Sequence, residues 1–170
     1  MDALHDPSRL REESSVDFRA VRTTDGTDAF EYYSDTAGLV ALGITNVEGA
    51  VLLMDSAHGW RLPYGGVDTG VDWFDRVEEI GRTLTGVDVS AADVVRVTEI
   101  THELATDAEQ TTTSFDAVVG TAPVDGDPIA DDPTFGEWED LELGWFDEVP
   151  EEAYHDHGDA VDDIELFLES

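Results

Sequence analysis

The 170-residue sequence contains no cysteine and no lysine. Without cysteine the chain cannot form disulfides or thiolate metal sites, so both are excluded. Its basic residues are eight arginines, against 41 aspartates and glutamates, and the formal net charge is −33. A surface of this charge repels the phosphates of DNA and RNA, and we therefore expect no nucleic-acid partner.

The excess of negative charge also bears on the conditions under which the chain folds. A net charge of this size destabilises a compact state by self-repulsion in dilute buffer. In ~1 M salt the Debye length falls to roughly 3 Å and the repulsion is screened. The acidic residues are interleaved with an ordinary apolar pattern, and 41% of the residues are hydrophobic. These features indicate a folded, halophilic protein, with an acidic nucleic-acid mimic or a metal buffer as alternatives.

Long apolar runs are missing as well. No segment approaches ~18 uninterrupted apolar residues, the length of a membrane-spanning helix. The first residues, MDALHDPSRLREES, lack the basic and apolar pattern of a signal peptide. We therefore expect no membrane partner and a cytoplasmic location. The length favours a single domain with a real hydrophobic core.

The pattern of apolar and turn residues predicts several strands and two main helices after a polar arm of residues 1–15. Pro7 and Ser8 favour a short helix within that arm. The expected elements are a hairpin of residues 16–22 and 29–33, buried strands 37–45 and 50–54 around a turn at 46–49, strands 94–104 and 111–122 around a loop at 107–110, a long loop at 123–140, a strand at 141–146, and a last helical region from Pro150 with its apolar face in 159–170. These elements predict an α+β fold, a mixed β-sheet sandwiched between α-helices.

The most informative stretch is residues 60–89, WRLPYGGVDTGVDWFDRVEEIGRTLTGVDV. It predicts a strand end and then a glycine-rich loop, in which Gly65 and Gly66 let the backbone turn. An amphipathic helix capped at or just before Asp72 is expected to follow. Gly86 is expected to end that helix in the left-handed conformation.

This stretch resembles the Nudix box of pyrophosphohydrolases, which reads Gly, five residues, Glu, seven residues, then Arg-Glu-apolar-any-Glu-Glu-any-Gly-apolar. With the first glycine at Gly65, the last glycine and apolar residue fall on Gly86 and Val87 without a gap. Residues 145–150, WFDEVP, resemble the closing segment of the same family. The resemblance implies a single Nudix-type domain over residues 16–170, with the box at 65–87. It also implies a hydrolase of nucleoside diphosphate derivatives that uses Mg²⁺ or Mn²⁺.

The carboxylates of the pattern are missing in this register. The family's glutamate positions hold Val71, Ile80, Thr83 and Leu84. An apolar helix face replaces the acidic one, because hydrophobic side chains recur at helical spacing at Trp73, Val77, Ile80 and Leu84. A rival register, in which residues 75–81 spell acid-x-x-Glu-Glu-x-Gly, needs five residues deleted after Val71. We therefore expect metal-dependent activity to be weak or absent. The alternative is a non-catalytic ligand-binding or protein-interaction module on the same fold, with no cofactor.

Relocated functional groups remain as hypotheses. The candidate metal ligands are Asp75, Glu78 and Glu79, and the candidate catalytic carboxylates are Glu79 and Glu99. Each of these acids has the alternative of an ordinary solvated surface residue. The candidate substrate-binding residues are Arg61, Tyr64, Gly65 and Gly66. The expected ligand is a nucleoside diphosphate-type small molecule, and an apolar helix face could also serve a homodimer instead of the core.

Histidine and serine residues offer two further kinds of chemistry. His155 and His157 stand among several aspartates and offer a transition-metal site, while His58 stands at a turn. For Ser114 no recognised motif places a general base, so the sequence does not predict nucleophilic catalysis.

Overall fold

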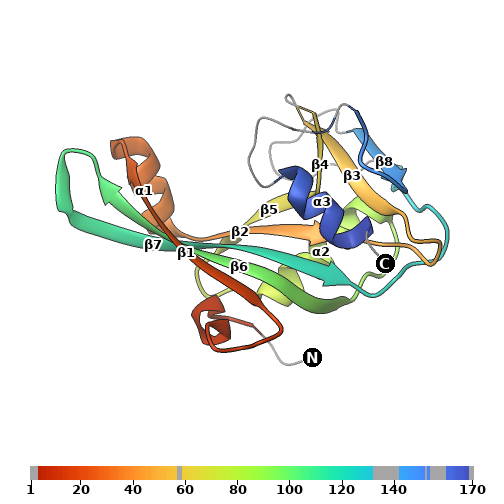
Figure 1. The fold of residues 1–170 in the computed structure, drawn as a ribbon, viewed down its shortest axis with the longest axis horizontal. Helices are drawn as coiled ribbons and strands as arrows, with labels where there is room; N and C mark the ends of the chain where they lie inside the picture. The colour runs from red at the N-terminus through yellow and green to blue at the C-terminus, as the bar shows by residue number, and fades with distance from the viewer. Residues whose placement is uncertain (1–3, 57–58, 132–141, 152, 154–159, 169–170) are drawn as a thin grey trace. The chain divides into compact units, whose positions relative to one another are not determined.

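The computed structural model describes residues 4–56, 59–131, 142–151, 153 and 160–168. The elements in chain order are η1 Pro7–Leu10, β1 Asp17–Asp25, α1 Thr27–Asp35, β2 Thr36–Gly43, β3 Val51–Ser56, β4 Gly59–Arg61, β5 Tyr64–Asp68, α2 Trp73–Thr85, β6 Ala91–Leu104, β7 Asp107–Thr121, β8 Glu142–Phe146 and α3 Ala160–Leu168 (Figure 1). The 3-10 helix η1 lies where Pro7 predicted a short helix. Within the described residues, no helix has the length and apolar character needed to cross a membrane.

The strands form two sheets. One has five strands in the order β1-β6-β7-β2-β5, and the other has three in the order β4-β3-β8. The larger sheet is mixed, because β1 runs parallel to β6 whereas β2 runs antiparallel to β5. Helices and a mixed sheet together give an α+β protein, as the sequence predicted.

The chain divides into two compact units. The first comprises Met1–Ala41, Tyr64–Arg76 and Val94–Val119, and the second comprises Leu42–Pro63, Val77–Asp93 and Gly120–Ser170. The elements β2, α2, β6 and β7 each continue from one unit into the other.

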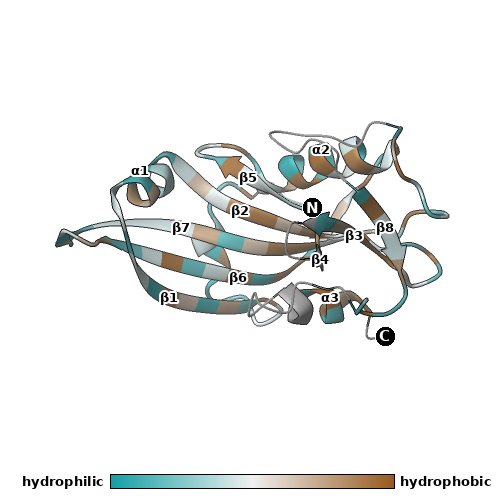
Figure 2. Cartoon of the chain, turned by 90° about the horizontal axis from the view of Figure 1, so that it is seen from above, coloured by the Kyte–Doolittle hydropathy of each residue, from teal (hydrophilic) through white to brown (hydrophobic). Residues whose placement is uncertain are grey.

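The first unit holds most of the five-stranded sheet. Its edge strand β1 is exposed along most of its length, and Figure 2 shows hydrophilic and hydrophobic residues mixed along it. By contrast, β2 changes from pale to brown along its length in the same view, and Val40 is fully buried. The helix α1 has no buried residue, and only Phe30 and Tyr33 of its nine residues are half-buried. It is therefore held to the sheet by few apolar contacts.

The second unit is built around β3, whose residues from Val51 to Met54 are all fully buried. This confirms the prediction of a strand buried on both faces. The helix α3 packs closely on two glycines, because a Cβ atom added at Gly43 or Gly120 would lie 2.1 Å or 3.0 Å from the ring of Phe167. Gly43 is in β2 and Gly120 is in β7, so these two strand ends contact α3 where the absence of a side chain leaves room for an aromatic ring.

The predicted hairpin of residues 16–22 and 29–33 is wrong. Residues 29–33 lie within α1, and β1 pairs in parallel with β6 instead. The apolar residues Phe30 and Tyr33 are three apart, which places them on one face of a helix. The side chain of Ser34 also supports the helix, since its hydroxyl donates to the Phe30 carbonyl at 2.8 Å.

The loop predicted at residues 107–110 is also a strand. β6 ends at Leu104 and β7 begins at Asp107, so only two residues form the turn between them. The polar residues of this hairpin tip are exposed, and exposed polar residues in a strand carry the same sequence signal as a loop.

The turn expected at Gly65 and Gly66 is a strand as well. Both glycines lie in β5 and pair with Val40 and Leu39 of β2. The chain turns later, at Gly70, whose φ angle of 87° lies in the left-handed region.

The last helix begins later than expected. Glu151 lies in a turn and Ala153 forms a β-bridge with Trp60, whereas α3 begins at Ala160. Within the predicted helical segment, the described residues 160–168 do form a helix, and Ile164 within it is fully buried.

Candidate functional site

The helix α2, within the stretch that resembles the Nudix box, begins beside Leu4 of the N-terminal segment. The Asp72 carboxylate accepts hydrogen bonds at 3.0 Å from the backbone N–H groups of Phe74 and Leu4. The N–H of Trp73 in turn donates to the Leu4 carbonyl at 2.7 Å. Asp72 therefore caps the helix as predicted, and the first two N–H groups of α2, those of Trp73 and Phe74, are paired within the protein.

One face of α2 is apolar and buried. The exposed fractions along it are 0% for Trp73 and Val77, 1% for Ile80 and 0% for Leu84. Ile80 and Leu84 occupy two of the family's carboxylate positions. Hard divalent cations take oxygen ligands, so the hydrocarbon side chains of Ile80 and Leu84 cannot replace carboxylates as metal ligands. The part of the helix that resembles a metal site is a packing surface.

The other two positions of the pattern also lack carboxylates. Val71 is 36% exposed and precedes the helix. Thr83 is half-buried, and its hydroxyl donates to the Glu79 carbonyl one turn earlier at 3.0 Å. Neither side chain supplies the negative charge that a divalent cation needs.

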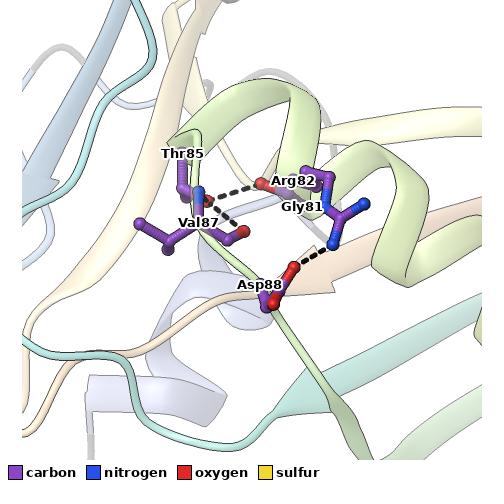
Figure 3. Close-up of polar contacts among 5 residues, drawn as sticks. All are labelled: Gly81, Arg82, Thr85, Val87 and Asp88. Carbon is purple, nitrogen blue, oxygen red and sulfur yellow. Dashed lines mark hydrogen bonds and ion pairs between the residues drawn. The ribbon is translucent and has the colours of Figure 1, made fainter.

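At the C-terminal end of α2, neighbouring residues hydrogen-bond to one another (Figure 3). The Thr85 hydroxyl donates to the Gly81 carbonyl at 2.7 Å, and the N–H of Val87 donates to the Thr85 hydroxyl oxygen at 3.2 Å. Gly86 has a φ angle of 78°, which confirms the predicted left-handed end. A Cβ atom at Gly81 would lie 2.9 Å from the Cβ of Val89, so the apolar side chain that the family has at this position does not fit here.

The candidate metal ligands lie beside the apolar face. Asp75 and Glu79 are exposed, and Glu78 is half-buried, where its carboxylate accepts a hydrogen bond from the N–H of Ala91 at 3.0 Å. The part of the chain that the structure describes contains no group of three or more His, Cys, Asp or Glu residues arranged to hold a metal ion.

The candidate catalytic residue Glu99 lies on β6 and forms an ion pair with Arg11. Its neighbour on the same face of β6, Glu103, is paired with Arg22 of β1. Both carboxylates are thus engaged with arginines of the N-terminal part of the chain.

The candidate substrate-binding residues lie on two strands. Arg61 is on β4 opposite Met54, in the second unit, and its Nε atom is buried. Tyr64, Gly65 and Gly66 are on β5, in the first unit. The Gly66 carbonyl accepts a hydrogen bond from the Nε of Arg76 at 2.8 Å, which joins the start of α2 to β5.

Two further arginines, Arg82 and Arg96, have acidic partners. Arg82 pairs with Asp88 (Figure 3), and this contact raises the pKa of Arg82. Arg96 is 7% exposed, and its Nε lies 3.4 Å from a carboxylate oxygen of Asp17.

The structure brings together a polar cluster that sequence reasoning missed. It consists of Asp25 on β1, His102 on β6 and Ser114 on β7, three strands that are neighbours in the sheet. His102 Nδ1 lies 2.5 Å from Asp25 Oδ2, and His102 Nε2 lies 2.7 Å from Ser114 Oγ. The ring of Tyr33, on α1, stacks on the imidazole with centroids 4.1 Å apart and planes 12° apart.

This Asp25–His102–Ser114 cluster is buried. Ser114 is 0% exposed and His102 is 2% exposed. The order of groups, carboxylate to imidazole to hydroxyl, is the order used by serine hydrolases. No sequence signal marked it, because Asp25 is 77 positions from His102, Ser114 is 12 positions from it, and only the arrangement of β1, β6 and β7 in the sheet brings the three together.

Three histidines that the sequence singled out, His58, His155 and His157, lie outside the described residues.

Comparison with known proteins finds no matching protein-family model and no matching curated protein.

Proposed function

We propose that the chain is a Nudix-type domain in which the box helix α2 is a packing element and metal-dependent pyrophosphohydrolase activity is weak or absent. The domain then serves as a ligand-binding or protein-interaction module. The observation that carries this proposal is the burial of Ile80 and Leu84, at most 1% exposed, at positions where the family holds carboxylates.

Support for the Nudix-type fold comes from the secondary structure of the stretch that resembles the box. Gly65 lies on a strand, a turn at Gly70 follows, and α2 runs from Trp73 to Thr85 before the left-handed Gly86. A mixed sheet accompanies this strand–turn–helix unit, as the resemblance implies.

The competing function is a hydrolase that uses relocated carboxylates with Mg²⁺ or Mn²⁺. Among its candidate residues, Glu78 accepts a hydrogen bond from the Ala91 N–H, and Glu99 pairs with Arg11. Asp75 and Glu79 are exposed, and a site of two exposed carboxylates keeps a cation weakly since water competes for it.

The test is a turnover assay in molar KCl. A panel of nucleoside diphosphate derivatives is incubated with Mg²⁺ or Mn²⁺, and we expect no product above background. Metal-dependent product that is lost in Glu79→Ala but kept in Glu109→Ala, a change of an exposed acid on β7, would overturn the proposal.

Ligand binding is measured separately by thermal unfolding with and without ADP. A ligand that binds only the folded state stabilises it, by about 2.7 kcal/mol at a concentration of 100 Kd. An ADP-dependent rise in Tm without hydrolysis supports a small-molecule module. If ADP leaves the Tm unchanged, the protein-interaction form of the proposal is the one to pursue.

A further inference from the structure

The Asp25–His102–Ser114 cluster is distinct in sequence from the box helix and has chemistry of its own. We propose that Ser114 is a nucleophile activated by His102 and Asp25, that its substrates are carboxylic esters, and that α1 covers it. The site is closed in this structure, and reaction requires α1 to move.

The hydrogen bonds set the direction of proton transfer. With Asp25 Oδ2 2.5 Å from Nδ1, the imidazole proton belongs on Nδ1, because an ionised carboxylate can only accept. Nε2 is then free of a proton and accepts the Ser114 hydroxyl at 2.7 Å. This is the tautomer that lets an imidazole act as a general base toward serine.

The reaction balances with water as the only other reactant. Ser114 Oγ attacks the ester carbonyl carbon while its proton passes to His102 Nε2. The C–O bond to the alcohol breaks, and the departing alkoxide takes that proton, which leaves an acyl-Ser114 ester. Water then attacks the acyl carbon with His102 again as the base, and the carboxylic acid and free Ser114 are released.

The cover is α1, and its attachment is slight. Tyr33 stacks on His102, and Phe30 is the other half-buried residue of the helix. The N-cap residue Gly26 has no side chain to bond the first turn. Segments with few buried apolar contacts open at a free-energy cost far below that of global unfolding. Opening of α1 would expose the imidazole first, because Tyr33 lies directly on it.

A buried polar network can also serve the fold alone, so the test must separate reactivity from packing. A fluorophosphonate probe, which phosphonylates activated serines, is incubated with the full chain in molar KCl, and the modified residue is located by mass spectrometry. We expect slow modification at Ser114, and an increase of at least about tenfold in Tyr33→Ala. The increase corresponds to about 1.4 kcal/mol of easier opening.

Variants of the cluster test the assigned roles. Ser114→Ala should lose the modification, and His102→Gln should lose it while keeping Ser114 in place. Asp25→Asn should slow it by a factor of up to about 10⁴, the effect of a wrong tautomer in serine proteases. Phe30→Ala gives a second way to loosen α1 if Tyr33→Ala does not fold. Far-UV circular dichroism confirms folding of each variant.

Two results would overturn the proposal. The first is no modification of Ser114 in the wild type and in a folded variant with a loosened α1. The second is modification at an equal rate in His102→Gln, since a serine that needs no imidazole is not activated by it. Exposed Ser90 serves as the internal control and should stay unmodified throughout.

Discussion

His102 Nε2 lies 2.7 Å from Ser114 Oγ, and neither side chain is more than 2% exposed. Through its other ring nitrogen, His102 also contacts Asp25, so one imidazole joins three neighbouring strands. Inside a protein, removing one partner of such a pair leaves the other unsatisfied, which costs more than the hydrogen bond contributed. Changing a residue of this cluster should therefore alter the free energy of unfolding as well as the reactivity of Ser114.

Replacing Ser114 by alanine should lower the free energy of unfolding by about 1–3 kcal/mol, because Nε2 of His102 loses its partner in a buried site. Urea unfolding in molar KCl measures the change. The matched control is Ser90→Ala at an exposed serine, which should stay within about 0.5 kcal/mol of the wild type. Equal effects of the two changes would contradict the network.

The contact between Tyr33 and the sheet should weaken at high pH. Burial raises the pKa of Tyr33 above its ordinary value of 10.0, with smaller contributions from Asp116, Asp25 and Tyr32. The folded state thus favours the neutral phenol. Its contribution to stability is complete below the unfolded pKa and is lost as pH rises through the higher folded pKa.

The measurement is Tm from about pH 8 to about pH 11 for the wild type and Tyr33→Phe. The two curves should run parallel below about pH 10, and above it the wild type should fall more steeply. Other tyrosines titrate in both proteins and cancel in the comparison. Parallel curves over the whole range would show that Tyr33 ionises without cost to the fold.

Replacement of Gly38 by any residue with a side chain should strongly destabilise the fold. Its φ angle is 148°, and an added Cβ atom would lie 1.8 Å from the backbone oxygen of Phe115. Because backbone atoms cannot move aside cheaply, Gly38→Ala should lower the free energy of unfolding by about 3 kcal/mol or more.

Gly49 provides the control for Gly38. Its φ angle of 92° is also unusual, but a Cβ atom there would meet nothing within 4 Å. Gly49→Ala should therefore cost only the backbone strain, about 1–2 kcal/mol. A loss of stability as large as that of Gly38→Ala would show that steric contact with Phe115 is not the cause.

A glutamate introduced where the Nudix pattern has one should destabilise the protein at position 84 and not at the neighbouring position 83. Leu84 is fully buried and Thr83 is half-buried, although both stand in the Glu-Glu pair of the pattern. Leu84→Glu buries an unpaired carboxylate and should cost at least about 3 kcal/mol. Thr83→Glu should stay within about 1 kcal/mol, and neither variant should gain Mn²⁺-dependent activity. A stable Leu84→Glu protein would place this face of α2 in solvent.

The fold should weaken as salt is removed. The net charge of −33 is spread over a chain with only eight arginines. The Debye length grows from roughly 3 Å in 1 M salt to roughly 30 Å in 0.01 M salt, so repulsion between distant acids returns in dilute buffer. Thermal unfolding across this range of KCl should show a Tm that rises with salt. A Tm independent of KCl would argue against adaptation to a salt-rich environment.

The sequence by itself determined the α+β class, the limits of α2 and the burial of β3. Each of these depends on a local signal. Asp72 and Gly86 bracket the helix, the apolar residues between them recur at helical spacing, and residues 51–54 form a continuous apolar run. The absence of carboxylates at the glutamate positions of the Nudix pattern could also be read from the sequence, because it depends only on residue identity at a fixed spacing.

Only the tertiary structure decided where α1 lies, how β1 pairs and which polar groups meet. Residues 29–33 have the composition of a strand, yet they form a helix that rests on His102 through Tyr33. Parallel pairing of β1 with β6 brings Asp25 to His102 across 77 positions of sequence. Periodicity reports which side of an element is buried, but it carries no information about the element that covers it. The Asp25–His102–Ser114 cluster forms only because β1, β6 and β7 are neighbours in the sheet.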